Sequence, residues 1–113
     1  MNGTPILLCS NFTFISPAGG GEITFPWVGF NAAFKEADLV IESKLVSSGN
    51  VDVKIESSTD TTMPTALGST NISAIGSVST PITSGLLQAL RLVISSSGAA
   101  GVTLTVWLVP KHD

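Results

Sequence analysis

The chain has 113 residues, of which 12% are charged and 43% hydrophobic, and its formal net charge is −3. The charged fraction is about half that of an ordinary soluble domain, so a free monomer would be poorly protected against association. The basic residues are few and scattered, which argues against nucleic-acid binding, and no apolar run approaches the length of a membrane-spanning helix.

Short β-branched or alternating runs, bounded by Gly, Pro, Ser or Asn, follow one another along the chain and predict strands. No segment has a convincing helical stripe of apolar residues. Residues 30–36 are the least regular stretch, and a short helical turn is an alternative there. Residues 59–69 are interpreted as a polar loop and residues 80–85 as a turn. Strands are expected at residues 6–15, 22–28, 37–46, 51–57, 71–78, 86–95 and 102–109.

The first two predicted strands each have a defined apolar face. In the second strand, Pro26 cannot donate to a ladder hydrogen bond, which predicts an edge strand or a bend. Period-two alternation places the following side chains together: Leu8, Ser10, Phe12 and Phe14 in the first strand, and Ile23, Phe25 and Trp27 in the second.

Two hairpins are predicted from turn signals between neighbouring strands. Gly49-Asn50 is typical of a tight turn, and it would join the strand over 37–46 to the strand over 51–57. The small-residue segment 96–101 would join the last two strands, so residues 86–109 are expected to form an antiparallel hairpin and the most regular part of the fold.

Seven or eight strands at even spacing predict an all-β fold. We expect a single domain over residues 1–113, an antiparallel β-sandwich that is jelly-roll-like, with short arms at residues 1–5 and 110–113. A small barrel is the alternative. Residues 89–93 are apolar on both faces, which indicates a second covered face. The expected core contains Val51, Val53, Ile55, Leu90, Leu92, Ile94, Leu104 and Val106.

Residues able to carry chemistry are scarce in this sequence. The only histidine, His112, lies next to the C-terminal residue. One histidine and one cysteine are too few for a zinc site, and a Ser-His-Asp triad would have to use His112, which is implausible. Cys9 lies in an apolar run and is expected to be a small buried hydrophobe rather than a reactive thiol. We therefore expect no enzyme activity, no catalytic residue, no cofactor and no metal.

Four carboxylates leave an alternative open. They could converge on Ca²⁺ as in some lectin sandwiches, or a pair of them could act as a glycosidase dyad, but no Asp-x-Asp-x-Asp spacing supports this. Two of them alternate with apolar residues and are offset by Lys54, so a solvated strand face is the favoured interpretation. The four are Glu42, Asp52, Glu56 and Asp60.

The two tryptophans are the side chains best suited to carbohydrate stacking or to the centre of an interface. Trp27 is expected in the core. Trp107 lies on the Thr103-Thr105 face of the last strand, opposite the aliphatic stripe, so both a core position and an interface position remain open for it.

The second half of the chain resembles small β-sandwich virion proteins of tailed bacteriophages, nearest to capsid decoration (cement) proteins. The resemblance covers residues 51–109. It consists of an alternating strand, the segment Glu56-Ser-x-x-Asp60, a loop with Pro64, Leu90-Arg-Leu92 and a final Thr-rich strand. It implies trimers or dimers that bind the capsid lattice and brace adjacent major capsid subunits, without catalytic residues.

We therefore expect a structural virion protein that binds the outer capsid surface and stabilises contacts between major capsid subunits. Its partners would be the major capsid protein and itself, as a homotrimer, with no nucleic acid and no membrane. It would be made in the host cytoplasm and be located on the virion. A carbohydrate-binding module and a phage tail or baseplate protein are the alternatives. The interface candidates are Met1, Asn2, Gly3, Thr4, Pro5, Trp107 and Lys111.

Overall fold

The computed structural model describes residues 5–29, 36–58, 65–83 and 89–111. Within these ranges the chain forms strands and no helix, so no helix there could cross a membrane. The strands are β1 (Ile6–Ser16), β2 (Gly21–Thr24), β3 (Val28–Gly29), β4 (Glu36–Ser48), β5 (Val51–Ser58), β6 (Thr65–Ile72), β7 (Gly76–Ile82), β8 (Ala89–Ser96) and β9 (Ala100–Lys111).

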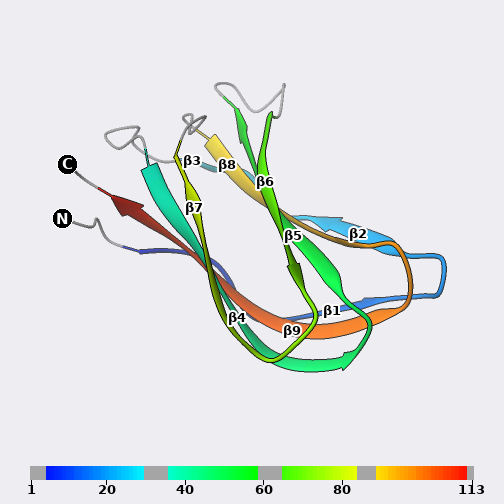
Figure 1. The fold of residues 1–113 in the computed structure, drawn as a ribbon. Helices are drawn as coiled ribbons and strands as arrows, with labels where there is room; N and C mark the ends of the chain where they lie inside the picture. Colours follow the sequence, from blue (N-terminus) through cyan, green and yellow to red (C-terminus); the bar gives the residue numbers. More distant parts are fainter. Residues whose placement is uncertain (1–4, 30–35, 59–64, 84–88, 112–113) are drawn as a thin grey trace.

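The strands form two antiparallel sheets packed face to face (Figure 1). The four-stranded sheet has the order β1-β9-β4-β7, and the five-stranded sheet has the order β2-β8-β5-β6, with β3 also paired to β8. Working inward from the chain ends, the pairs β1·β9, β2/β3·β8, β4·β7 and β5·β6 alternate between the two sheets. Such a rolled-up hairpin is the jelly-roll arrangement, so the predicted β-sandwich is confirmed.

Both predicted hairpins are wrong, although their turns occur where expected. β4 lies in the four-stranded sheet and β5 in the five-stranded sheet, and β8 and β9 are separated in the same way. Gly49-Asn50 and residues 97–99 therefore carry the chain from one sheet to the other. The physical reason is that alternation specifies which face of a strand is buried, but not which strand lies beside it.

The predicted boundaries fail in the Ser- and Thr-rich third quarter of the chain. β6 occupies part of the expected loop 59–69, and β7 extends into the expected turn 80–85. The strand expected at 71–78 is divided, because its first two residues end β6, its last three begin β7, and residues 73–75 connect the two strands. β6 and β7 are edge strands with largely exposed side chains, so their sequences lack the apolar alternation of a buried strand. The helical turn considered at 30–36 falls almost entirely outside the described residues.

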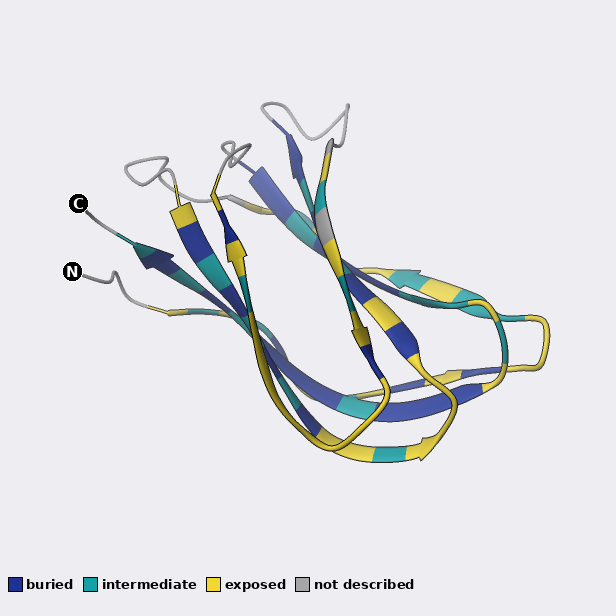
Figure 2. Cartoon of the chain, viewed as in Figure 1, coloured by how far each residue is buried: buried dark blue, intermediate teal, exposed yellow. Residues whose placement is uncertain are grey.

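The core lies between the inner faces of the sheets. All eight predicted core residues are 2% exposed or less, which confirms that set. Figure 2 shows the burial concentrated along β8 and β9, which, like β4 and β5, have a neighbouring strand on each side. The core is extended from β4 by Leu39 and Ile41 and from β9 by Val102 and Leu108.

Strand β1 does not keep a single alternating face. Its register against β9 shifts on both sides of Cys9, and Asn11 has a φ of 48°, a left-handed conformation that Asn tolerates better than most residues. The Asn11 N–H donates to Oγ1 of Thr105 at 3.0 Å. These bulges put Cys9 in the core, as expected for a small hydrophobe, and leave Ser10 exposed on a strand where it was expected to share a face with Phe14.

An edge strand or a bend was predicted at Pro26, and both occur, because β2 and β3 are two short pieces on one side of β8. The break also changes which face the side chains use. Val28 lies opposite the core residue Leu90, so Trp27, the preceding residue, is on the outer face. The expectation that Trp27 lies in the core is therefore wrong.

The turns at one end of the sandwich are tied together by hydrogen bonds. Ser16 Oγ donates to Gly98 O at 2.7 Å, Ser96 Oγ donates to Asn50 O at 2.9 Å, and Ser47 Oγ donates to Gly101 O at 3.1 Å. These contacts join the turn after β1, the turn after β4 and the turn after β8, so this end of the domain is held as one unit.

Replacing either of two buried serines, Ser16 and Ser43, should change the free energy of unfolding in opposite directions, although both are 5% exposed. Ser43 Oγ has no hydrogen-bond partner among the described residues, so Ser43→Ala should raise the free energy of unfolding by about 1 kcal/mol. Ser16 Oγ has a partner, so Ser16→Ala should lower it by about the same amount. Urea unfolding followed by tryptophan fluorescence measures both, and equal effects of the same sign would contradict the assignment.

Candidate interaction surface

The predicted interface candidates occupy different places. Met1 to Thr4 lie outside the described residues, and Pro5 is exposed just before β1. Trp107 and Lys111 both lie on the outer face of the four-stranded sheet, since they are on the same side of β9. Pro110 and Lys111, which were assigned to a C-terminal arm, are part of β9, where they pair with the start of β4.

An apolar row crosses this outer face at Trp107. Leu7 of β1 lies on one side of Trp107 and Val40 of β4 on the other. The Leu7 side chain is 47% exposed, while Trp107 and Val40 are partly buried. Large apolar side chains usually lie inside, so a row of them on an outer face is informative.

Two more exposed aliphatic side chains extend the row toward the tied turns. Leu45 lies opposite Thr103 and is 53% exposed, and Ile15 lies opposite Gly101 and is 78% exposed. Between them, the Thr13 and Thr103 hydroxyls hydrogen-bond at 2.9 Å. We call this surface the Trp107 face; it consists of Leu7, Ile15, Val40, Leu45 and Trp107.

The charged side chains beside and between the residues of the Trp107 face are already paired within the chain. Lys111 Nζ lies 3.1 Å from Asp38 Oδ1, and Lys44 Nζ lies 3.3 Å from Glu42 Oε2. Both pairs are surface pairs that contribute little to stability. They do leave the surroundings of the Trp107 face close to neutral, so a partner need not bring a strong charge.

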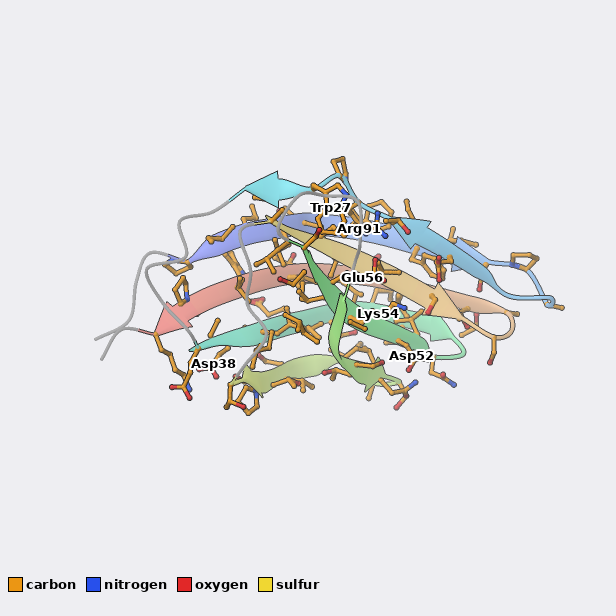
Figure 3. The ribbon with its side chains drawn as sticks, turned by 90° about the horizontal axis from the view of Figure 1, so that it is seen from above. Trp27, Asp38, Asp52, Lys54, Glu56 and Arg91 are labelled. Carbon is orange, nitrogen blue, oxygen red and sulfur yellow. The ribbon has the colours of Figure 1, made fainter. Side chains whose placement is uncertain are left out.

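The outer face of the five-stranded sheet carries polar side chains that pair with one another. Arg91 Nε donates to Glu56 Oε1 at 2.6 Å, and the Arg91 guanidinium lies 4.5 Å from the centre of the Trp27 ring (Figure 3). Lys54 Nζ is 4.0 Å from Glu56 on its other side. One face of the Trp27 ring is thus covered by a cation of its own chain and is not free for stacking with a ligand.

The carboxylates do not converge. Glu42 lies on the four-stranded sheet, whereas Asp52 and Glu56 lie on the five-stranded sheet, and Asp60 is outside the described residues. In the described part of the chain no three Asp, Glu, His or Cys side chains are grouped so that they could hold a metal ion. The Ca²⁺ alternative is therefore wrong for the three described residues, and Glu56 instead pairs with Arg91.

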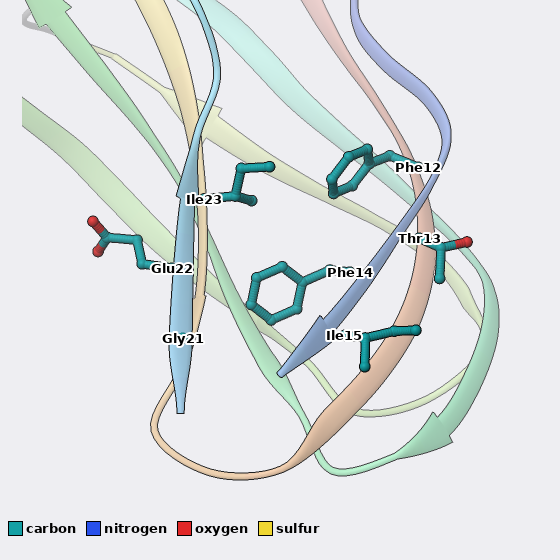
Figure 4. Close-up of a pocket in the computed structure, with 7 residues that line it drawn as sticks. All are labelled: Phe12, Thr13, Phe14, Ile15, Gly21, Glu22 and Ile23. Carbon is teal, nitrogen blue, oxygen red and sulfur yellow. The ribbon is translucent and has the colours of Figure 1, made fainter. Parts of the chain in front are cut away.

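A pocket of about 380 Å³ opens between the edge strands β1 and β2 (Figure 4). Phe12, Phe14 and Ile23 point into it, while the Glu22 carboxylate and the Thr13 hydroxyl point away. It is a gap between two sheet edges lined by apolar side chains, and it brings no polar groups together for catalysis.

Cys9 should be unreactive in the folded protein. Burial raises the pKa of its thiol, and a backbone hydrogen bond at Val106 offsets this in part. Stability contributed by the protonated thiol is then present below the unfolded pKa of about 8.5 and is lost as pH rises through the higher folded pKa. We expect a thiol reagent to label Cys9 at pH 8 only in denaturant; rapid labelling of native protein would contradict this.

Comparison of the sequence with known proteins finds no match, whereas comparison of the fold with solved structures finds chains from virus structures. No protein-family model and no curated protein matches the chain. The fold is similar to a chain of the structure of infectious bursal disease virus, Gt strain, with a TM-score of 0.54 and 14% identity, covering 94% of this chain and 30% of that chain. For the Gx strain the TM-score is 0.50 and the identity 16%, covering 96% and 31%.

At this identity the likeness shows the fold alone. This chain spans less than a third of the length of the chains it matches. Both matching chains come from structures of infectious bursal disease virus, so neither match shows the expected resemblance to decoration proteins of tailed bacteriophages.

Proposed function

We propose that this chain is a structural protein of a virus particle, without catalytic activity, that binds other protein subunits through the Trp107 face. The observation that carries the proposal is the apolar row Leu7–Trp107–Val40 on the outside of a jelly-roll sheet. The buried centres of interfaces are more apolar than the rest of a protein surface and are enriched in aromatic side chains such as tryptophan. The likeness to chains of a virus structure supports a place in the virion.

The specific role proposed is that of a decoration protein on the outer capsid surface, with the major capsid protein as partner. The protein would be made in the host cytoplasm. Binding to assembled capsid in preference to separate subunits would stabilise the assembled state by mass action. Several copies joined in one oligomer would hold the lattice more firmly than one copy.

The first test is whether virus particles from the natural source contain the chain in fixed proportion to a capsid protein. The second adds purified protein to particles stripped of it and measures occupancy and heat resistance. We expect Leu7→Lys with Leu45→Lys to reduce occupancy at least tenfold, because two charges would lie in the apolar contact. Thr24→Lys, which adds a charge to the exposed outer face of the other sheet, is the control and should bind normally.

The outcome that removes the proposal is absence of the chain from purified particles, or unchanged heat resistance when it is bound. Recovery only in tail fractions would favour a tail or baseplate protein. Binding to a glycan array without binding to capsid would favour the carbohydrate-binding alternative.

A further inference from the structure

Among the described residues the two sheets have four edge strands or strand pairs, β1 and β7 in one sheet and β2/β3 and β6 in the other, each with a described strand on one side only. Natural sheets protect such edges with bulges, interruptions, charged side chains or proline. β1 carries two register shifts, β6 pairs with β5 through a bulge, and β2 and β3 are separated by Pro26. These three edges are therefore irregular.

The edge of β7 is different, because its register against β4 runs without a shift from Gly76 to Ile82. It is also uncharged: residues 61–90 contain no Asp, Glu, Lys, Arg or His. Figure 2 shows β7 as mostly exposed, and Val78 is 39% exposed although it lies opposite the core residue Ile41. A regular, uncharged and exposed edge is the kind that pairs with another strand.

Pro81 identifies which backbone groups of β7 are free. A proline in a sheet must turn its nitrogen away from the neighbouring strand, so the backbone groups of Pro81 point to the free edge. Backbone direction alternates along a strand, and Ser77 and Ser79 therefore also point their N–H and C=O groups outward. The free edge offers two complete donor–acceptor sets, at Ser77 and Ser79, and an acceptor at Pro81.

We propose that β7 pairs with β7 of a second copy of this chain, antiparallel about a two-fold axis at Val78. In this register Ser77 lies opposite the partner's Ser79, and each of the two equivalent pairs exchanges both of its backbone hydrogen bonds. Val78 lies opposite its own copy and becomes covered. Pro81 lies beyond these pairs, so the absence of its backbone N–H removes no hydrogen bond at the centre of the contact.

A second copy is the occupant that the edge chemistry favours. Two-fold antiparallel pairing makes the same edge complementary to itself, and the absence of charge on β6 and β7 means that no like charges meet. The result is a continuous sheet of eight strands that displays two Trp107 faces. This two-fold pair differs from the homotrimer expected from the sequence, and it does not depend on capsid binding.

The experiment uses charges at positions 77 and 79, whose side chains are exposed. In the variant Ser77→Lys with Ser79→Lys, each new lysine faces a lysine of the partner, and we expect the dimer dissociation constant to rise roughly tenfold or more. In the matched variant Ser77→Lys with Ser79→Glu, each lysine faces a glutamate, and the dimer should persist at low salt and weaken as salt is added. Analytical ultracentrifugation over a concentration series gives the dissociation constants.

Thermal unfolding of the monomeric species shows that each variant is folded. A wild-type chain that stays monomeric at 100 µM, or that forms a trimer unaffected by the two lysines, would overturn the inference. Equal loss of association in both variants would show that residues 77 and 79 do not face each other across the contact.

Discussion

Gly49→Ala should lower the free energy of unfolding by about 3 kcal/mol, one of the two largest effects expected for a single substitution in this domain. Gly49 has a φ of 64°, where a residue with a Cβ is strained by roughly 1–2 kcal/mol. The added Cβ would also collide with the backbone oxygen of Ala99. Because the turn after β4 is tied to the turn after β8, neither can move away freely.

Two other glycines separate the contributions of strain and collision. Gly76 has a φ of 149°, but a methyl group there would have no other atom within 4 Å, so Gly76→Ala should show strain alone. Gly19 has open space, and Gly19→Ala should change stability by less than about 0.5 kcal/mol. The melting temperatures of the three variants, which shift by about 4 °C per kcal/mol, rank their effects on stability. If Gly49→Ala has the same melting temperature as Gly19→Ala, the turns are not packed as described.

Leu92→Ala should lower the free energy of unfolding by about 2–5 kcal/mol. Leu92 is 1% exposed on β8, and its side chain packs in the core between the two sheets. Removing that side chain loses the transfer free energy and leaves a cavity that the surrounding strands, paired on both sides of β8, cannot close. Urea unfolding gives the difference directly.

The matched substitution is Leu45→Ala, which deletes the same atoms from a side chain that is 53% exposed on the Trp107 face. It should change the stability of the free domain by less than about 1 kcal/mol, because little is buried there. Its effect should appear in binding instead. A loss of stability equal to that of Leu92→Ala would mean that Leu45 is covered within the domain itself.

The sequence predicts β1 and the strands in the middle of each sheet to within three residues of their bounds, whereas it misplaces the edge strands β6 and β7. In β5, β8 and β9, aliphatic residues recur at every second position because one face is buried along the whole strand. The same pattern identified the core, including Val53, Ile94 and Leu104. Alternation does not specify the neighbouring strand, and therefore the jelly-roll pairing could not be obtained from it.

The interaction surface was harder to predict because its residues come from three strands whose pairing is not visible in the sequence. Alternation places Trp107 opposite the aliphatic stripe of β9 and places Leu7 and Ile15 opposite Phe14 in β1, but Leu45 reaches the same face only through a register shift in β4. Trp27 changed face at the Pro26 interruption. The edge of β7 did leave a signal in the sequence, since a long stretch without charge surrounds it.

The position of β9 determines when this domain can fold during synthesis. β9 is the last described strand in the chain, yet it lies between β1 and β4 and pairs with both. Until β9 has been made, β1 has no partner and the four-stranded sheet can hold only β4 and β7. Domains dominated by such distant pairings fold slowly. A nascent chain therefore keeps its first strand unpaired until β9 has been translated, and a chain truncated before β9 would expose that strand permanently.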